Sequence, residues 1–176
     1  MKVNLVAALA VASLTLLAVP VHAAQMPKVG DTAPLFTGQD QNGKTINLAG
    51  LIGKKIALLY FYPKAFTPGC TKEACGFRDR MGELQKDNVE VIGVSFDTVA
   101  RQKAFTEKYK LDFPLIGDPE GKIVNLYGVR MDHLDMAHRV SFLIGLDGKI
   151  VPVTDSGNPE DHFEQMKAAI AALKEK

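Results

Sequence analysis

The chain has 176 residues, of which 47% are hydrophobic and 23% charged, a composition typical of an ordinary globular protein. Its 21 Lys and Arg residues nearly balance its 20 Asp and Glu residues, which argues against a nucleic-acid binder or a polybasic membrane-surface protein. The two cysteines exclude a disulfide-dense scaffold and a four-thiolate zinc site.

The first 23 residues differ from the rest of the chain. Lys2 is their one charged side chain, and an almost uninterrupted apolar run extends over Val6–Val19. Small residues then occupy positions −3 and −1 of a cleavage site after Ala23, a pattern that predicts a secretory signal peptide over residues 1–23. Cleavage after Ala24 is an alternative, and an uncleaved membrane anchor is the competing interpretation.

The predicted mature chain, residues 24–176, is long enough for one domain with a real core. No later apolar run approaches the ~18 residues of a transmembrane helix, so we expect no membrane association after cleavage. The leader predicts that the mature protein works outside the cytosol, in a bacterial periplasm. There a cysteine pair can be stably oxidised or can cycle between redox states.

Strands and helices alternate along this domain. Turn residues punctuate residues 26–50, with a hairpin at Gln41–Lys44. Apolar and β-branched runs predict strands, and periodic apolar stripes predict helices. The strands are expected over residues 56–62, 89–94, 113–116, 140–144 and 149–153, and the helices over 68–87, 98–109, 122–127 and 159–174. This order predicts a mixed sheet between helix layers, and we interpret the fold as thioredoxin-like α/β.

The segment that carries specific chemistry follows the first buried strand. Thr67 and Pro68 have the form of a helix N-cap with proline at the first helical position. Cys70 then falls on the third helical residue, where unpaired backbone N–H groups and the positive end of the helix dipole favour a thiolate over a thiol. A small buried hydrophobe is the alternative interpretation of Cys70.

Cys75 lies five residues after Cys70. In a continuous helix this spacing separates the two Cα atoms by ~8.6 Å, whereas a disulfide needs less than ~7 Å. The two cysteines therefore cannot bridge while the helix is intact, and a bridge between them would be reducible rather than structural. We expect the backbone to bend at Gly69 and Gly76, and Gly76→Ala to stiffen the helix by up to ~1 kcal/mol.

The stretch FYPKAFTPGCTKEACGFRD resembles the peroxiredoxin Q, or bacterioferritin comigratory protein, subfamily of peroxiredoxins. The resemblance continues through VIGVSFD, FPLIGDPEGK, YGV and HRVSFLIGLDGKI, so it covers nearly all of the mature chain. It implies a thioredoxin fold and the reduction of hydrogen peroxide and organic hydroperoxides.

The resemblance also assigns residues to roles. It implies that Cys70 is the peroxidatic cysteine and that Cys75 is the resolving cysteine, which forms an intramolecular disulfide with it. Pro63 and Thr67 match the other members of the motif. Arg139 matches an arginine that orients thiolate and peroxide, and Glu73 an acid that holds the loop from behind.

The same resemblance implies the partners. A thioredoxin-like dithiol is expected to re-reduce the disulfide, no cofactor is implied, and we expect a monomer or weak dimer. The chain departs from the family in its export signal, since most members are intracellular, and in Gly145, where an acid is common.

Other polar residues carry weaker signals. His133 and His138 lie five apart, a spacing that does not place two ligands on one helix face, so we interpret them as a solvated loop and predict no metal site. His162 follows an acidic helix start and is expected to be exposed. Arg78, Asp79 and Arg80 are interpreted as the solvated face of the helix that carries the cysteines.

Two other functions compete with a peroxidase. An exported thiol–disulfide oxidoreductase acting on protein disulfides is possible on the same fold, although the chain lacks a Trp-Cys-x-x-Cys motif. A non-catalytic binding protein stabilised by a disulfide is the third possibility, and it requires a Cys70–Cys75 bond that resists mild reductant.

Overall fold

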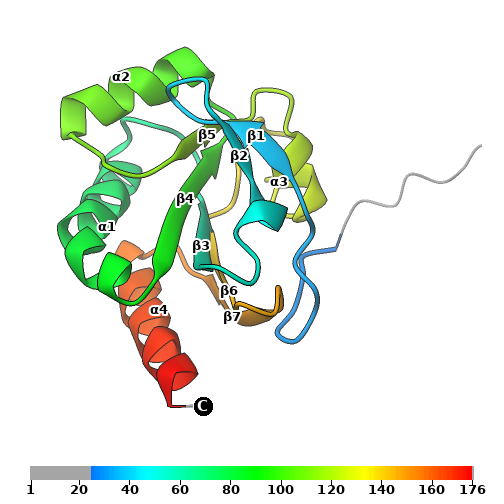
Figure 1. The fold of residues 1–176 in the computed structure, drawn as a ribbon. Coiled ribbons are helices and arrows are strands. Elements are labelled where there is room, and N and C mark those ends of the chain that lie inside the picture. Colours follow the sequence, from blue (N-terminus) through cyan, green and yellow to red (C-terminus); the bar gives the residue numbers. More distant parts are fainter. Residues whose placement is uncertain (1–24, 176) are drawn as a thin grey trace, which may run out of the picture.

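The structure, a computed structural model, describes residues 25–175. The predicted leader and its cleavage site lie outside these residues. The described part is a mixed α/β fold (Figure 1). Its elements in chain order are β1 (Thr37–Gln39), β2 (Thr45–Asn47), the 3-10 helix η1 (Leu48–Gly50), β3 (Ile56–Phe61), α1 (Pro68–Lys86), β4 (Val89–Ser95), α2 (Val99–Tyr109), β5 (Leu115–Gly117), α3 (Lys122–Leu126), β6 (Val140–Ile144), β7 (Ile150–Asp155) and α4 (Pro159–Lys174).

The main sheet has the strand order β5-β4-β3-β6-β7. β3 is parallel to β4 and antiparallel to β6, so the sheet is mixed, as the sequence predicts. All six residues of β3 are buried, and their side chains alternate between two cores. The continuous apolar run that begins at Ile56 therefore reflects a central strand covered on both faces. The thioredoxin-like α/β fold is confirmed.

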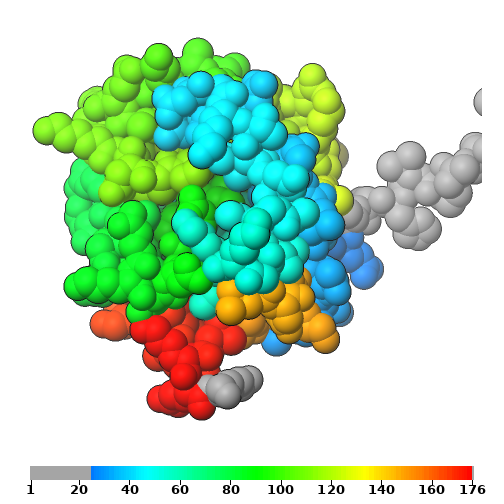
Figure 2. All heavy atoms as spheres, in the orientation of Figure 1, coloured from blue at the N-terminus to red at the C-terminus, as the bar shows by residue number. Residues whose placement is uncertain are grey.

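Helices and the N-terminal hairpin cover the two faces. Phe77 of α1, Phe105 of α2 and Phe163 of α4 belong to one core, and Ile123 of α3 belongs to the other together with Phe36. Accordingly, α1, α2 and α4 lie on one side of the sheet, and α3 with β1 and β2 on the other (Figure 1). In the space-filling view the segment around β2, in cyan, lies on the face of the molecule that is turned to the viewer (Figure 2).

The predicted elements are confirmed, with ends displaced by one or two residues. Gly43, with φ of 75°, lies in the predicted hairpin turn between β1 and β2, a backbone conformation that favours glycine. Within residues 25–175, no helix is both long and apolar enough to cross a membrane.

Candidate active site

The first turn of α1 presents Cys70 as the sequence predicts. Thr67 is the N-cap with extended backbone, Pro68 is the first helical residue, and Cys70 is the third. The first hydrogen bond of the helix runs from the amide of Thr71 to the carbonyl of Thr67, over 2.9 Å. The amides of Gly69 and Cys70 therefore have no partner within the helix and can meet an incoming oxygen.

The side chain of Thr67 does not cap the helix, contrary to the usual role of an N-cap threonine. Its hydroxyl instead donates to the carbonyl of Lys64 over 3.0 Å. This bond closes the loop that precedes α1. The Thr67 oxygen keeps lone pairs with which to accept a hydrogen bond from a bound molecule.

Arg139 lies directly beside the thiol. It is the residue before β6, and the antiparallel register pairs Val140 with Phe61 at the end of β3. This pairing brings Arg139 next to the loop that leads into α1, and its Nη2 lies 3.4 Å from Sγ of Cys70. A Cβ at Gly69 would be 3.1 Å from Nη2, so glycine leaves room for the guanidinium.

Glu73 holds Arg139 from the far side. Its carboxyl oxygen Oε2 accepts a hydrogen bond from Nη1 of Arg139, and its side chain has no exposed surface. Burial raises the pKa of Glu73 to about 8, although Arg139 lowers it. Glu73, Arg139 and Cys70 thus form a line of polar groups at the start of α1. The structure therefore brings together three of the residues that the sequence resemblance assigned to the site.

A second set of residues, missed by the sequence analysis, fixes the loop before α1. Asp97 accepts a hydrogen bond from the amide of Ala65 over 2.7 Å and pairs with Arg101 at 2.8 Å. Arg101 in turn donates to the carbonyl of Ala65. Phe66 has a φ of 70°, unusual for a bulky residue, and its ring packs 5.1 Å from that of Phe105. Asp97 lies in the quoted VIGVSFD segment, just after β4, a position that could have indicated a role in the site.

The remaining motif residues lie at the edges of this arrangement. Pro63 is half-buried and follows the last buried residues of the β3 run. Cys75 is half-buried in α1, and both cysteines are free. Because α1 is continuous from Pro68 to Lys86, the two thiols are held apart in this form.

The expectation that His162 is exposed is wrong. Its side chain is completely buried, with Nδ1 2.8 Å from Oγ of Ser141 and Nε2 2.9 Å from the carbonyl of Ser156. Nδ1 also lies 3.9 Å from Oε1 of Glu73. His162 precedes the buried Met166 by four residues and so shares the inner face of α4, a spacing that outweighs the acidic residues beside it.

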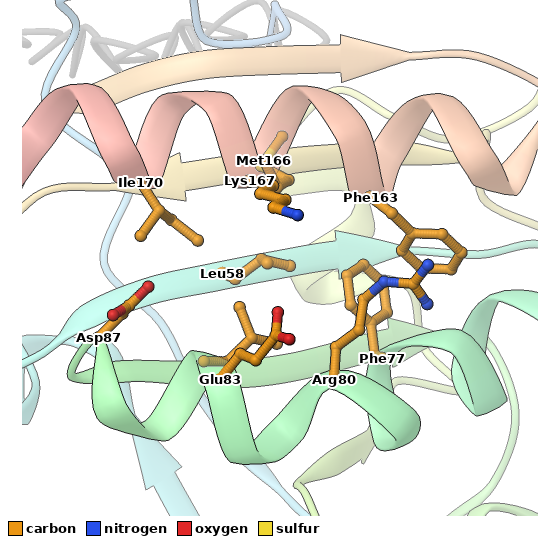
Figure 3. A pocket seen from close by; sticks show the side chains of 10 residues that line it. Leu58, Phe77, Arg80, Glu83, Asp87, Phe163, Met166, Lys167 and Ile170 are labelled. Carbon is orange, nitrogen blue, oxygen red and sulfur yellow. The ribbon is translucent and has the colours of Figure 1, made fainter.

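The expectation that Gly76→Ala only stiffens the helix is wrong, and so is the interpretation of Arg80 as part of a solvated face. A Cβ at Gly76 would meet the ring of Phe163, with Cε2 only 2.6 Å away. Gly76 is therefore a close-packing position between α1 and α4, and bending of the backbone at Gly69 and Gly76 on oxidation stays a prediction. The guanidinium of Arg80 lies over the same ring, 4.4 Å from its centroid, at one end of a narrow pocket between the two helices (Figure 3).

Arg78 and Asp79, the other two residues of the predicted solvated face, differ in their exposure. Asp79 is exposed, as predicted, whereas Arg78 is half-buried and donates to the carbonyl of Tyr109 over 2.6 Å. His133 and His138 are exposed. Within the described part of the chain, no three His, Cys, Asp or Glu side chains gather as a metal site would require.

Comparison with known proteins identifies the family. Residues 29–153 match the model of the AhpC/TSA family. The chain belongs to this family of peroxiredoxins. It is 43% identical to peroxiredoxin Bcp of Escherichia coli K12 over 143 residues, which are 78% of this chain and 91% of that protein. It is 48% identical to the chloroplastic peroxiredoxin Q of Triticum aestivum over 146 residues, 82% of this chain and 67% of the other.

Solved structures agree with this assignment. Peroxidoxin BcpB of Mycobacterium tuberculosis superposes with a TM-score of 0.78 at 35% identity, over 83% of this chain and 97% of that one. The bacterioferritin comigratory protein of Xanthomonas campestris superposes with a TM-score of 0.72 at 26% identity, over 78% and 91%. This peroxiredoxin is accordingly a peroxidase, with a peroxide as substrate and a thiol as reductant.

Proposed function

We propose that this peroxiredoxin reduces hydrogen peroxide and organic hydroperoxides through Cys70, forms a Cys70–Cys75 disulfide and is re-reduced by a thioredoxin-like dithiol. The observation that carries the proposal is the 3.4 Å contact between Arg139 and the Cys70 sulfur at the first turn of α1. A cation and unpaired amides at one sulfur favour the thiolate, the species that attacks electrophiles.

The chemistry follows from this geometry. The Cys70 thiolate attacks one peroxide oxygen, the O–O bond breaks, and sulfur becomes a sulfenic acid while an alkoxide or hydroxide leaves and is protonated. Arg139 and the amides of Gly69 and Cys70 stabilise the negative charge as it moves from sulfur to the leaving oxygen. Thr67 orients the peroxide, and Pro63 excludes water and shields the sulfenic acid from overoxidation.

Burial of the Cys70 thiol affects the second step of the reaction, in which Cys70 and Cys75 form the disulfide. The side chain of Cys70 is only 1% exposed, and Cys75 lies further along the same unbroken helix. Condensation of Cys75 with the sulfenic acid releases water and forms the S–S bond, and it requires the start of α1 to unwind. The resulting disulfide is a strained, reducible bond suited to a dithiol donor.

Two substitutions test the assignment of the cysteines. Cys70→Ser is expected to abolish peroxide consumption, whereas Cys75→Ser consumes one equivalent and stops as a sulfenic acid. Stopped-flow peroxide consumption and mass spectrometry of the product measure both. Loss of the first equivalent in Cys75→Ser, with retention in Cys70→Ser, would show that the roles are reversed.

We also propose that the protein acts after export, in a periplasm, and the leader pattern of residues 1–23 supports this. Fractionation of a Gram-negative host that expresses the full chain should place the protein in the periplasm, with a mature N-terminus at Ala24 or Gln25. A protein that stays in the cytosol at full length would contradict export. Adding candidate dithiol donors one at a time identifies the reductant.

Activity on two substrates, a hydroperoxide and the disulfides of insulin, distinguishes the proposed peroxidase from the competing thiol–disulfide oxidoreductase. A peroxidase consumes hydroperoxide with the donor but does not accelerate the reduction of insulin disulfides. The opposite pattern would favour an exported thiol–disulfide oxidoreductase.

A further inference from the structure

One oxygen atom of the buried Glu73 has no hydrogen-bond partner. Oε2 pairs with Arg139, whereas Oε1 is fully buried and accepts no hydrogen bond. A buried carboxylate oxygen without a donor is costly, and a carboxyl group in this position lowers the cost by carrying a proton. The nearest ring nitrogen facing it is Nδ1 of His162, at 3.9 Å.

The hydrogen bonds of His162 determine what it can offer Glu73. Nε2 faces the carbonyl of Ser156, which can only accept, so Nε2 carries the hydrogen. In the neutral ring, Nδ1 then has no hydrogen and carries a lone pair, which accepts a hydrogen bond from the hydroxyl of Ser141. A neutral His162 therefore supplies no hydrogen to Oε1, and the carboxylate form of Glu73 is left without a donor on that side.

Charges from every neighbouring element act on this pair. Arg139 contacts both Glu73 and Cys70, and the charge of Glu73 contributes to raising the pKa of the buried Tyr60 hydroxyl on β3. Burial lowers the pKa of His162 and Arg139 lowers it further, against the opposing effects of the Ser156 carbonyl and of Asp161 and Asp155. The neutral ring and the protonated carboxyl group thus favour each other.

We propose that Glu73 carries a proton on Oε1 while Cys70 is a thiolate and gives it up when Cys70 is oxidised, with His162 as the positioning residue that sets this balance. The inference rests on the proposed role of Cys70. In the reduced protein, the positive charge of Arg139 is matched by the thiolate. Once the sulfur becomes a neutral sulfenic acid, the same positive charge is matched by the carboxylate of Glu73.

The proton balance of the step is then fixed. The thiolate and the hydroperoxide give a sulfenic acid and an alkoxide, and the alkoxide takes up one proton. Glu73 releases one proton in the same step, so the reaction takes up none from solution while Glu73 is protonated beforehand. Where Glu73 is already ionised, the reaction takes up one proton per peroxide.

Proton uptake in a single turnover tests this directly. Reduced Cys75→Ser protein, which stops at the sulfenic acid, is mixed with one equivalent of hydrogen peroxide in weakly buffered solution containing a pH indicator. We expect uptake close to zero well below pH 8, rising towards one proton per peroxide above it. If no peroxide is consumed at all, the proposed function fails, which is a different result from a wrong proton count.

Glu73→Gln in the same background is the control that separates Glu73 from Cys70. It is expected to take up one proton per peroxide at the pH values where the parent takes up none. If uptake in Glu73→Gln falls to zero at low pH as in the parent, the proton resides on the Cys70 thiol and the proposal is overturned.

His162→Asn tests the positioning residue. Its amide N–H lies near the position of Nδ1 and can donate to Oε1, which stabilises the carboxylate, so the midpoint of the uptake curve is expected to move to lower pH. A merely structural role would lower stability and leave the midpoint unchanged, and an unchanged midpoint overturns the role of His162.

Infrared difference spectra provide a readout if His162→Asn does not fold. Peroxide should remove a carboxylic-acid C=O band from the Cys75→Ser protein, and Glu73→Gln should lack this change. His162→Gln, which keeps an N–H for the Ser156 carbonyl, should shift the frequency of the band. Absence of the band in the parent, or an unshifted band in His162→Gln, overturns the corresponding part of the proposal.

Discussion

Gly76→Ala is expected to destabilise the reduced protein, although alanine is the better helix former. The new Cβ would overlap the ring of Phe163, whose Cε2 lies 2.6 Å away. That ring is held in place, because it is 4% exposed, packs edge-on against Phe77 at 5.0 Å and lies beneath the guanidinium of Arg80. Overpacking of this kind costs ~1–3 kcal/mol, and the helix-propensity gain returns up to ~1 kcal/mol.

The expected net loss is therefore about 1 kcal/mol in the free energy of unfolding. Chemical denaturation of the reduced protein measures it, with Gly82→Ala in the same helix as the matched control. A Cβ at Gly82 meets nothing within 4 Å, so this substitution should stabilise the protein by up to ~1 kcal/mol. Phe163→Leu should reduce the penalty of Gly76→Ala, because the two sites are in contact. If Gly76→Ala is as stable as Gly82→Ala, the packing argument is refuted.

Three further predictions concern the site. Arg139→Met should slow the reaction of Cys70 with peroxide by about 10²–10³-fold without unfolding the protein, and a wild-type stopped-flow rate would contradict the role of Arg139. The folded pKa of Glu73 is about 8 against an ordinary 4.5, so the folded state binds more protons and its stability should fall as pH rises through this interval. Denaturation of Glu73→Gln should lack that slope, and an unchanged slope would assign it elsewhere. Amide hydrogen exchange at the start of α1 should be faster in the oxidised protein, and equal protection in both redox states would refute unwinding.

Local features of the site were predictable from the sequence. The position of Cys70 depends on Thr67 and Pro68 beside it, and a helix start is specified by the residues within one turn. The central strand was predictable because its run is apolar throughout, as burial on both faces requires. For such features the determining residues are neighbours in the chain.

The supporting contacts were not predictable in the same way. The bond between Asp97 and Ala65 spans 32 residues, and the approach of His162 to Glu73 joins α4 to α1. Both contacts depend on the order of the strands in the sheet, and the helical and strand periodicity of the sequence gives no information about that order. Gly76 illustrates the consequence, because helix propensity describes its own helix and not the ring of Phe163 packed against it.

The packing of Phe163 on Gly76 also limits how far α1 has to unwind. A Cα separation of ~8.6 Å must shorten by only ~2 Å before Cys70 and Cys75 can form a disulfide. Both cysteines lie before Gly76, whereas the helix after it is anchored by the buried Phe77 and Met81. Unwinding beyond Gly76 would expose these side chains and cost far more than the few hydrogen bonds of the first turns, at ~0.5–1.5 kcal/mol each. We therefore expect oxidation to loosen residues 68–75 and to leave the helix from Gly76 onwards in place.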